Sequence, residues 1–169
     1  MASVLTITPC LWFDTEAEEA VRFYVSIFPD ATIERVARYG KEGFDVHGKP
    51  ADSVLTVTFR LLGTAFVALN GGPHFKFNEA VSFIVQCEDQ AEIDRYWAAL
   101  GDGGDAKAQQ CGWLKDRFGL SWQIVPRELP AMMSGPDRAK SERVMKALLQ
   151  MKKLDLAALK RAYDGAPPP

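Results

Sequence analysis

Stretches of alternating hydrophobic and polar residues, interrupted by helical patterns, run from the N-terminus to Pro126. The first stretch, residues 4–13, predicts a β-strand. Apolar residues then recur at three- and four-residue steps, which predicts an amphipathic helix that ends before Pro29. Thr15 and Glu18 have the spacing of a capping box, in which each side chain accepts a hydrogen bond from a free amide at the helix start. The apolar face of this helix consists of Ala17, Ala20, Val21, Tyr24, Ile27 and Phe28.

Three more strands are predicted after this helix, because the chain becomes rich in alternating β-branched residues. Between the first two of them, residues 40–53 hold three glycines, a proline and several charges, which predicts an irregular loop. Gly63 and Thr64 predict the tight turn of a hairpin, and the run from Asn70 to Pro73 ends the pattern. The three strands are expected at residues 32–39, 54–62 and 65–69.

The same order of elements then starts again. Residues 81–87 predict a strand, and Asp89 with Glu92 repeats the capping pattern. The helix that follows is expected to end at Gly101, a residue type favoured just after a helix. Residues 111–115 and 120–125 predict a second hairpin. The apolar stripe of the second helix consists of Ile93, Tyr96, Trp97 and Leu100.

The repeated order of strand, helix and strands predicts an α+β protein. We expect two βαβββ modules, residues 1–72 and 78–127, within one domain of residues 1–130. The two halves share the order of their elements but almost no identical residues. Because a βαβββ module cannot cover both faces of its own sheet, two modules that pack together are the expected arrangement.

A helical extension is predicted after the second hairpin, at residues 135–164. It begins with a helix at residues 137–153, and Asp155 then stands where it can cap a second short helix. Apolar stripes of this kind usually pack, so these two C-terminal helices are expected to cover their own domain or a partner. Residues 165–169 are expected to fray into solvent. The stripe of the first helix is Val144, Leu148 and Met151, and Leu154 and Leu159 have the spacing of a hydrophobic staple.

Composition and charge narrow the choice of partners. The 169 residues are 47% hydrophobic, which is ample for a filled core, and the net charge of −2 argues against a nucleic-acid binder. The N-terminus lacks the basic and apolar regions of a signal peptide, and no apolar run reaches the ~18 residues of a membrane span. The basic residues near the C-terminus alternate with leucines and predict a solvated helix face; they are Lys152, Lys153, Lys160 and Arg161.

The cysteines indicate a reducing compartment. Cys10, Cys87 and Cys111 are odd in number and have no CxxC spacing, which favours free thiols over a disulfide framework. We therefore expect a cytoplasmic protein that has neither a membrane nor a nucleic-acid partner.

Three segments of the chain resemble PhnB-like proteins. The first comprises residues 7–13 (ITPCLWF) and residues 18–30, the second residues 69–80 (LNGGPHFKFNEA), and the third residues 110–126 (QCGWLKDRFGLSWQIVP). This family, often labelled 3-demethylubiquinone-9 3-methyltransferase, belongs to the vicinal-oxygen-chelate superfamily of glyoxalases, bleomycin-resistance proteins and dioxygenases. The resemblance implies that the two modules form a cup-shaped mixed sheet around a pocket, commonly in a homodimer.

The chain itself gives the methyltransferase label no support. A methyltransferase of the usual kind holds its cofactor at a glycine-rich turn between a parallel strand and a helix. Here Gly71 and Gly72 are followed by Pro73 and an aromatic run, with no helix predicted after them.

The resemblance also implies where a metal ion would bind. Enzymes of the superfamily hold one divalent ion with His and Glu ligands from both modules, and the ion polarises oxygen atoms of the substrate. The chain has only His47, in the irregular loop, and His74, between the modules, as imidazoles. We therefore expect neither metal nor cofactor, because neutral amide and hydroxyl oxygens are weak ligands for a transition metal. The positions that match the superfamily's ligands are Thr8 or Pro9, Ala68 or Asn70, Ser82, and Gln123.

A pocket lined by aromatic side chains and a few polar groups is typical of small-molecule sites. Several alternatives stay open: the tryptophans can fill a closed core, and the two amides can bond backbone groups. Cys111 can be a nucleophile, with Lys115 and Arg117 nearby in sequence, or an inert thiol. The candidate pocket residues are Trp12, Asn70, His74, Phe75, Ser82, Cys111, Trp113, Trp122 and Gln123.

Three classes of function are compatible with this pattern. The prediction is a metal-independent binder of a small molecule whose catalytic residues, if any, are not assigned. The alternatives are an enzyme of lyase, isomerase or oxygenase type around His74, Ser82 and Gln123, and a structural or regulatory dimer that uses the C-terminal helices.

Overall fold

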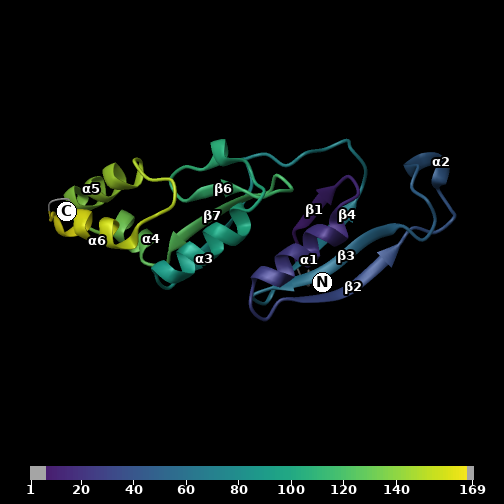
Figure 1. Cartoon of the computed structure of the whole chain (residues 1–169), viewed down its shortest axis with the longest axis horizontal. Coiled ribbons are helices and arrows are strands. Elements are labelled where there is room, and N and C mark those ends of the chain that lie inside the picture. Colours follow the sequence, from purple (N-terminus) through teal and green to yellow (C-terminus); the bar gives the residue numbers. More distant parts are fainter. Residues whose placement is uncertain (1–6, 167–169) are drawn as a thin grey trace, which may run out of the picture. The chain divides into compact units, whose positions relative to one another are not determined.

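The structure is a computed structural model, and it describes residues 7–166 (Figure 1). The chain forms two compact units, Met1–Lys76 and Phe77–Pro169. Residues 4–6 of the predicted first strand and residues 167–169 of the predicted frayed tail lie outside the described residues. Each unit contains one mixed sheet with a helix packed on it, which confirms the predicted α+β fold class.

The N-terminal unit contains a four-stranded sheet in the order β1-β4-β3-β2. β1 runs parallel to β4, whereas the other two pairs are antiparallel. The predicted helix and the three strands after it are confirmed to within one residue at each end, but the first strand begins only at Cys10, because Pro9 has no amide hydrogen to donate. The elements are β1 (Cys10–Phe13), α1 (Ala17–Ile27), β2 (Thr32–Arg38), α2 (Phe44–His47), β3 (Val54–Leu61) and β4 (Thr64–Asn70).

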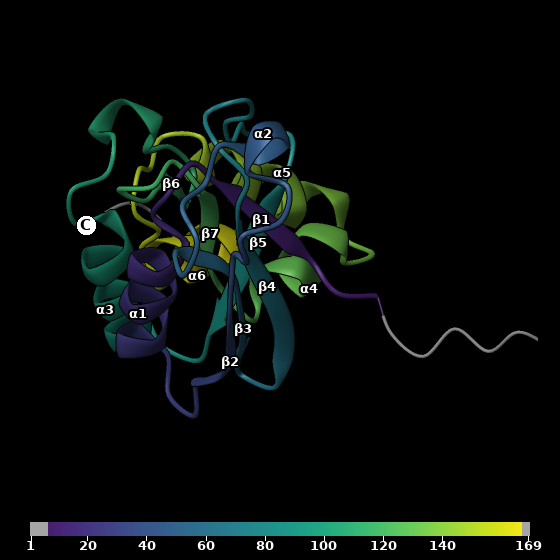
Figure 2. The same ribbon diagram turned by 90° about the vertical axis from the view of Figure 1, so that its right-hand side faces the viewer.

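Helix α1 covers one face of this sheet, as Figure 2 shows. Alternate strand residues point to that face, and aromatic rings meet there: Tyr24 of α1 stacks on Phe59 with 6.4 Å between ring centroids, and Phe59 stacks on Phe66 at 5.3 Å. The opposite face of the sheet carries no helix of this unit. The side chains of the N-terminal core are Leu11, Phe13, Ala17, Ala20, Val21, Tyr24, Phe28, Val57, Phe59, Leu61, Phe66 and Ala68.

The connections of the sheet depend on left-handed backbone conformations. Leu62 and Gly63 have φ angles of 47° and 80°, which is the signature of the tight hairpin turn predicted between β3 and β4. The loop at residues 40–53 is longer and contains the short helix α2 at its tip (Figure 1).

The predicted capping box of α1 is wrong. Glu16 is the N-cap residue, and no side chain of the helix start caps it. The side chain of Glu16 instead accepts a hydrogen bond from the Thr15 amide at 2.9 Å. A distant residue, Asn70, provides the cap with its Oδ1 atom, which accepts from the Ala17 amide at 2.8 Å. Thr15 and Glu18 therefore do not form the predicted capping box.

The C-terminal unit contains a three-stranded sheet in the order β5-β7-β6. β5 is parallel to β7, and β6 is antiparallel to it. The three strands predicted for this half, at residues 81–87, 111–115 and 120–125, are all present, and the segment between the helix and β6 forms a short 3₁₀ helix and a turn. The elements are β5 (Ser82–Cys87), α3 (Gln90–Gly101), the 3₁₀ helix Ala106–Ala108, β6 (Trp113–Lys115) and β7 (Ser121–Pro126).

Helix α3 packs on one face of this sheet and begins as predicted. Asp89 accepts a hydrogen bond from the Glu92 amide at 2.9 Å, and the Glu92 carboxylate accepts one from the Glu88 amide at 2.9 Å. The core between helix and sheet is formed by Val85, Cys87, Ile93, Tyr96, Leu100, Leu114, Trp122 and Ile124.

Three C-terminal helices follow β7, where two were expected (Figure 1). The predicted helix at residues 137–153 ends at Leu148, and a further short helix precedes it. Asp155 caps the last helix as predicted, accepting from the Ala158 amide at 2.8 Å. Leu154 and Leu159 of the predicted staple are both fully buried. The helices are α4 (Leu129–Ser134), α5 (Arg138–Leu148) and α6 (Leu156–Asp164).

Candidate ligand-binding site

Each sheet has one face covered by its own helix and one face that this helix leaves uncovered. Because strand side chains alternate between the faces, the position of a residue along its strand decides on which face it lies. Six of the nine candidate pocket residues lie in strands and divide between the two faces, whereas His74, Phe75 and Cys111 lie in connecting segments.

Trp12 lies on the uncovered face of the N-terminal sheet, between the buried residues Leu11 and Phe13. Its indole Nε1 donates a hydrogen bond to the Gly72 carbonyl at 2.9 Å, and Phe75 meets its ring edge-on, with centroids 4.9 Å apart. A side chain at Gly71 would lie within 2.2 Å of the indole ring. Gly71 therefore lets the chain pass closely over Trp12.

His74 and Phe75 are both exposed, and 65% of the Phe75 surface is accessible. Phe75 is thus a large apolar side chain that stays at the surface beside Trp12. The other imidazole, His47, is held in the loop: its Nδ1 accepts from the Lys49 amide at 2.9 Å, and its ring lies 4.5 Å from the Tyr39 ring.

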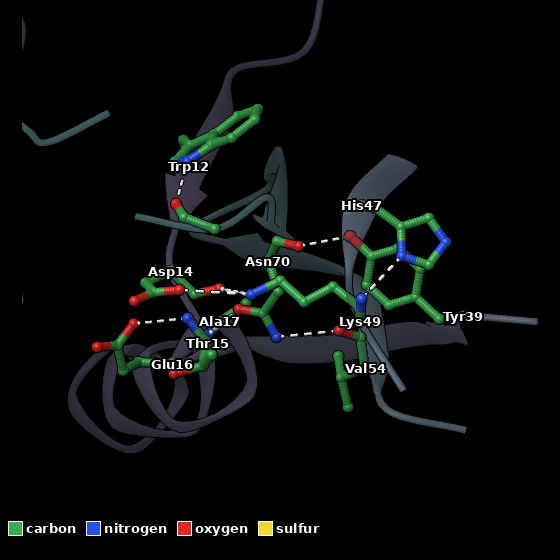
Figure 3. A network of polar contacts seen from close by, with 11 residues as sticks. Trp12, Asp14, Thr15, Glu16, Ala17, Tyr39, His47, Lys49, Val54 and Asn70 are labelled. Atoms are coloured by element: carbon green, nitrogen blue, oxygen red, sulfur yellow. Dashed lines mark hydrogen bonds and ion pairs between the residues drawn. The ribbon is translucent and has the colours of Figure 1, made fainter. Parts of the chain in front are cut away.

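Asn70 lies on the helix-covered side of β4, buried and fully used by the fold (Figure 3). Its Oδ1 accepts from the Ala17 amide, and its Nδ2 donates to the Val54 carbonyl at 3.0 Å. The Tyr39 hydroxyl donates to the Asn70 backbone carbonyl at 2.6 Å. These contacts favour the structural role that was left open for this amide.

Lys49 belongs to the same network, although no sequence pattern indicates it (Figure 3). Its ammonium group donates to the Asp14 carbonyl at 3.0 Å and lies 3.4 Å from Asp14 Oδ1. This contact joins the loop at residues 40–53 to the end of β1. An isolated lysine in an irregular loop gives no periodic pattern from which such a contact could be predicted.

Ser82, Trp113 and Gln123 lie together on the uncovered face of the C-terminal sheet. Gln123 is the strand partner of Trp113, and its Nε2 donates to Ser82 Oγ at 2.9 Å. All three side chains are half-buried. The sequence prediction therefore identified three candidates that the structure brings side by side.

Ser121 joins this group, although the sequence analysis missed it. It is two residues before Gln123 in β7 and is the strand partner of Ser82. Ser121 is 1% exposed, and among residues 7–166 its Oγ is the one buried side-chain polar atom without a hydrogen-bond partner. The alternation of β7 could have placed it on the Gln123 face.

Trp122 points to the opposite face, toward α3. It is buried, and its Nε1 donates to Asp116 Oδ2 at 2.8 Å. Asp116 is buried as well, and its Oδ1 accepts from the Phe118 and Leu120 amides at 2.9 Å and 3.0 Å. The contacts of Trp122 are those of a core residue that fixes the β6–β7 turn.

Cys111 lies in a turn that the C-terminal segment holds. The Cys111 amide donates to the Met151 carbonyl at 2.8 Å, and the Gly112 amide donates to the Lys152 carbonyl at 2.7 Å. Cys111 has a φ angle of 52°, so the backbone is in the left-handed region at this residue. The described contacts give this thiol a place in a structural turn rather than beside a base.

The other two thiols differ in burial. Desolvation raises the pKa of the buried Cys87 thiol to about 12, with a smaller contribution from the Glu92 charge. Burial also raises the pKa of the Cys10 thiol, although this residue is exposed.

The residues at the expected metal positions do not fit a divalent transition ion. Asn70 is used by backbone groups, Ala68 is apolar, and Ser82 and Gln123 bond each other. All of these donors are neutral, whereas such ions prefer imidazole, thiolate or carboxylate ligands. Within residues 7–166, no three His, Cys, Asp or Glu side chains gather closely enough to hold a metal ion.

Comparison with known proteins identifies the family of the chain. The model of the 3-demethylubiquinone-9 3-methyltransferase family matches residues 5–125. The chain belongs to this family. A PhnB protein structure from Bacillus cereus is 32% identical to this PhnB-like chain; the match covers 72% of the chain and 99% of that protein, with a TM-score of 0.62.

Two further structures are similar to this PhnB-like protein. A protein from Pseudomonas aeruginosa is 23% identical over 73% of this chain and 98% of that one, with a TM-score of 0.57, and it shows the fold. The fosfomycin resistance protein FosX from Mesorhizobium loti is 16% identical over 73% of this chain and 91% of that one, with a TM-score of 0.49. The search of curated proteins found no match.

The helices of residues 7–166 are all too short or too polar to cross a lipid bilayer.

Proposed function

We propose that this PhnB-like protein binds a small molecule, without a metal ion, on the uncovered face of its C-terminal sheet. The observation that carries the proposal is the unpartnered Oγ of Ser121 beside the bonded pair of Ser82 and Gln123. A buried hydroxyl without a partner is costly, and in native proteins such groups usually have a bound partner in the working state. A ligand oxygen or nitrogen would supply that partner.

The side chains around Ser121 fit such a ligand. Trp113 presents an indole ring next to Gln123, and Ile84, the other strand partner of Gln123, is an exposed apolar residue. A few convergent polar groups among apolar and aromatic side chains are the usual composition of a small-molecule site.

The name of the family does not extend to the activity of this chain. The Gly71 and Gly72 amides, which a cofactor bound at this turn would need, donate to the Phe13 and Asp14 carbonyls at 2.9 Å and 3.3 Å. The next described element after these glycines is strand β5, not a helix. The homodimer and the cytoplasmic location stay predictions.

A ligand screen by thermal shift tests the proposal, with protein that has been treated with a chelator. We expect a compound to raise the melting temperature in a saturable way, and we expect Gln123→Ala and Ser121→Ala to weaken its binding roughly tenfold. Gln150→Ala is the matched control, because Gln150 is an exposed amide after α5 and outside the sheet, and its loss should change the affinity less than about twofold.

Two results would contradict the proposal. The first is a stabilising ligand whose effect disappears with the chelator and returns with added metal. The second is a ligand whose affinity is the same in the wild type, in Gln123→Ala and in Ser121→Ala.

A further inference from the structure

Three polar side chains form a row across the uncovered face of the C-terminal sheet. Ser121 of β7 is the strand partner of Ser82 in β5 and of Lys115 in β6. Because strand partners point to the same face, two hydroxyl groups and one ammonium group lie in one line. The adjacent row, two residues further along the strands, holds Gln123 and Trp113.

The ammonium group of this row is already occupied by a carboxylate of the chain itself. Lys115 forms an ion pair with Glu79, a residue of the segment before β5. The hydrogen bond from Lys115 lowers the pKa of the Glu79 carboxyl, so the group is ionised at neutral pH. Glu79 is 63% exposed and Lys115 23% exposed, so the carboxylate lies at the outer side of the row.

This ion pair is easily exchanged. An exposed pair of this kind is weakly stabilising, because water screens it and both side chains lose rotamer freedom. The Glu79 side chain is a carboxylate tethered by a short flexible stem, and it leaves Ser121 Oγ without a partner. The carboxylate of a ligand has no such tether. One of its oxygen atoms can accept from the Lys115 ammonium group while the other accepts from the Ser121 hydroxyl group.

We propose that the ligand of this face carries a carboxylate, and that it replaces Glu79 as the partner of Lys115. Ser121 Oγ then donates to the second carboxylate oxygen, and the apolar part of the ligand lies against Trp113. Glu79 therefore competes with the ligand for Lys115. It lowers the affinity for carboxylates although it makes no contact with the bound ligand. This inference rests on the proposed binding function and adds the chemical class of the ligand.

Isothermal titration calorimetry with three related probes tests the inference. The probes are 2-naphthoate, its neutral analogue 2-naphthamide, and a cationic analogue, 2-naphthylmethylammonium. We expect saturable binding of 2-naphthoate and binding of the other two that is weaker by roughly tenfold or more, because only the carboxylate makes charge-assisted hydrogen bonds.

Two variants separate competition from general electrostatics. Glu79→Gln removes the competing charge and should tighten 2-naphthoate binding by about fivefold, and Lys115→Met should weaken it by roughly tenfold. The matched control is Asp94→Asn, which makes the same change of net charge in the same unit, at another surface ion pair, Lys153 with Asp94 at 2.6 Å. This control should leave the affinity unchanged. If Lys115→Met does not fold, the comparison of Glu79→Gln with Asp94→Asn decides alone, because Glu79 is exposed.

Three results would overturn the inference: equal binding of naphthoate and naphthamide, equal tightening in Glu79→Gln and Asp94→Asn, or no effect of Lys115→Met on binding. The proposed function fails in a different way. If a neutral compound binds and loses affinity in Ser121→Ala, the binding function stands while the carboxylate inference fails. If no compound of any charge is sensitive to Ser121→Ala or Gln123→Ala, both fail.

Discussion

Asn70 joins two elements that are far apart in the sequence, since its amide group links the start of α1 to the start of β3. Replacing it with alanine removes one buried and one partly buried hydrogen bond, and the Ala17 amide and the Val54 carbonyl lose their side-chain partner. We expect Asn70→Ala to lower the free energy of unfolding by about 2–4 kcal/mol, measured by urea denaturation.

The control for this substitution is Asn78→Ala. Asn78 is exposed, and its side chain accepts only one local hydrogen bond, from the Ala80 amide at 3.0 Å. Its removal should change the free energy of unfolding by less than about 0.5 kcal/mol. Equal effects of the two substitutions would show that Asn70 is not a structural residue.

Thiol reactivity tests the burial of Cys87. With a pKa of about 12, its thiol is almost wholly protonated at pH 8, and the thiolate is the reactive form. The sign follows from desolvation, which disfavours the charged thiolate and so slows alkylation below the pKa. In native protein at pH 8, we expect iodoacetamide to modify Cys10 at least about tenfold faster than Cys87, as followed by peptide mass spectrometry.

Unfolding in urea provides the control for this experiment. The rates at the two cysteines should then become similar, because burial no longer protects Cys87. Native-state modification of Cys87 at the rate of Cys10 would contradict the structure of the α3–sheet core.

At the residue level, the sequence predicted three of the five residues of the polar group on the C-terminal sheet. Ser82, Trp113 and Gln123 were identified because the family pattern and the alternation of the strands agree on them. Ser121 and Lys115 follow from the same alternation, but Ser121 is not among the predicted candidates, and Lys115 enters the prediction only as a cation near Cys111. Asn70 and Trp122 could not be assigned from one sequence, since their partners Ala17 and Asp116 come from contacts that no local pattern encodes.

Local sequence patterns predicted the elements well where the contacts that form an element come from neighbouring residues. Asp89 and Glu92 form the capping contacts that their spacing indicates, whereas Thr15 and Glu18 have a similar spacing and do not. The difference is Asn70, which reaches the helix start from β4 and takes the place of the local cap. A hydrogen bond from a distant residue thus replaced the cap that the spacing of Thr15 and Glu18 predicted.

The C-terminal helices are fixed to the C-terminal sheet by a side chain at the start of α3. Gln90 donates from Nε2 to the Leu154 carbonyl at 3.1 Å and accepts at Oε1 from the Leu156 amide at 2.8 Å. The same segment holds the Cys111 and Gly112 amides through the Met151 and Lys152 carbonyls. The extension is therefore part of the C-terminal unit rather than an appended tail.

Loss of this clamp should be visible in hydrogen exchange. We expect Gln90→Ala to lower the free energy of unfolding by about 1–2 kcal/mol and to speed exchange at the Cys111 and Gly112 amides. Gln150→Ala, at an exposed position after α5, is the control and should leave exchange at both amides unchanged. Unchanged protection in Gln90→Ala would mean that the segment is held by its buried leucines alone.

Over the whole molecule, the family and the α+β fold class were predictable, because three long segments carry the family pattern and the order of elements repeats. The three strands of the second module were predictable as well, whereas the short 3₁₀ helix before β6 was not, because a single turn of helix leaves no periodic pattern in the sequence. The cup that two such modules would form stays a prediction.

The chemistry of the donor set gives the last prediction, which concerns metal. The superfamily positions hold threonine or proline, alanine or asparagine, serine, and glutamine in this chain, and Asn70, Ser82 and Gln123 already bond protein groups. Neutral oxygens that are in use compete poorly with water for a divalent ion. We expect untagged protein, dialysed without chelator, to hold less than about 0.1 equivalent of nickel, zinc, iron or manganese by elemental mass spectrometry. Near-stoichiometric metal would mean that ligands outside the superfamily positions hold the ion, and it would make an atypical metalloenzyme the leading interpretation. A metal content equal to that of the buffer would instead leave the ligand screen as the direct route to the function, since binding would then depend on the side chains of the sheet alone.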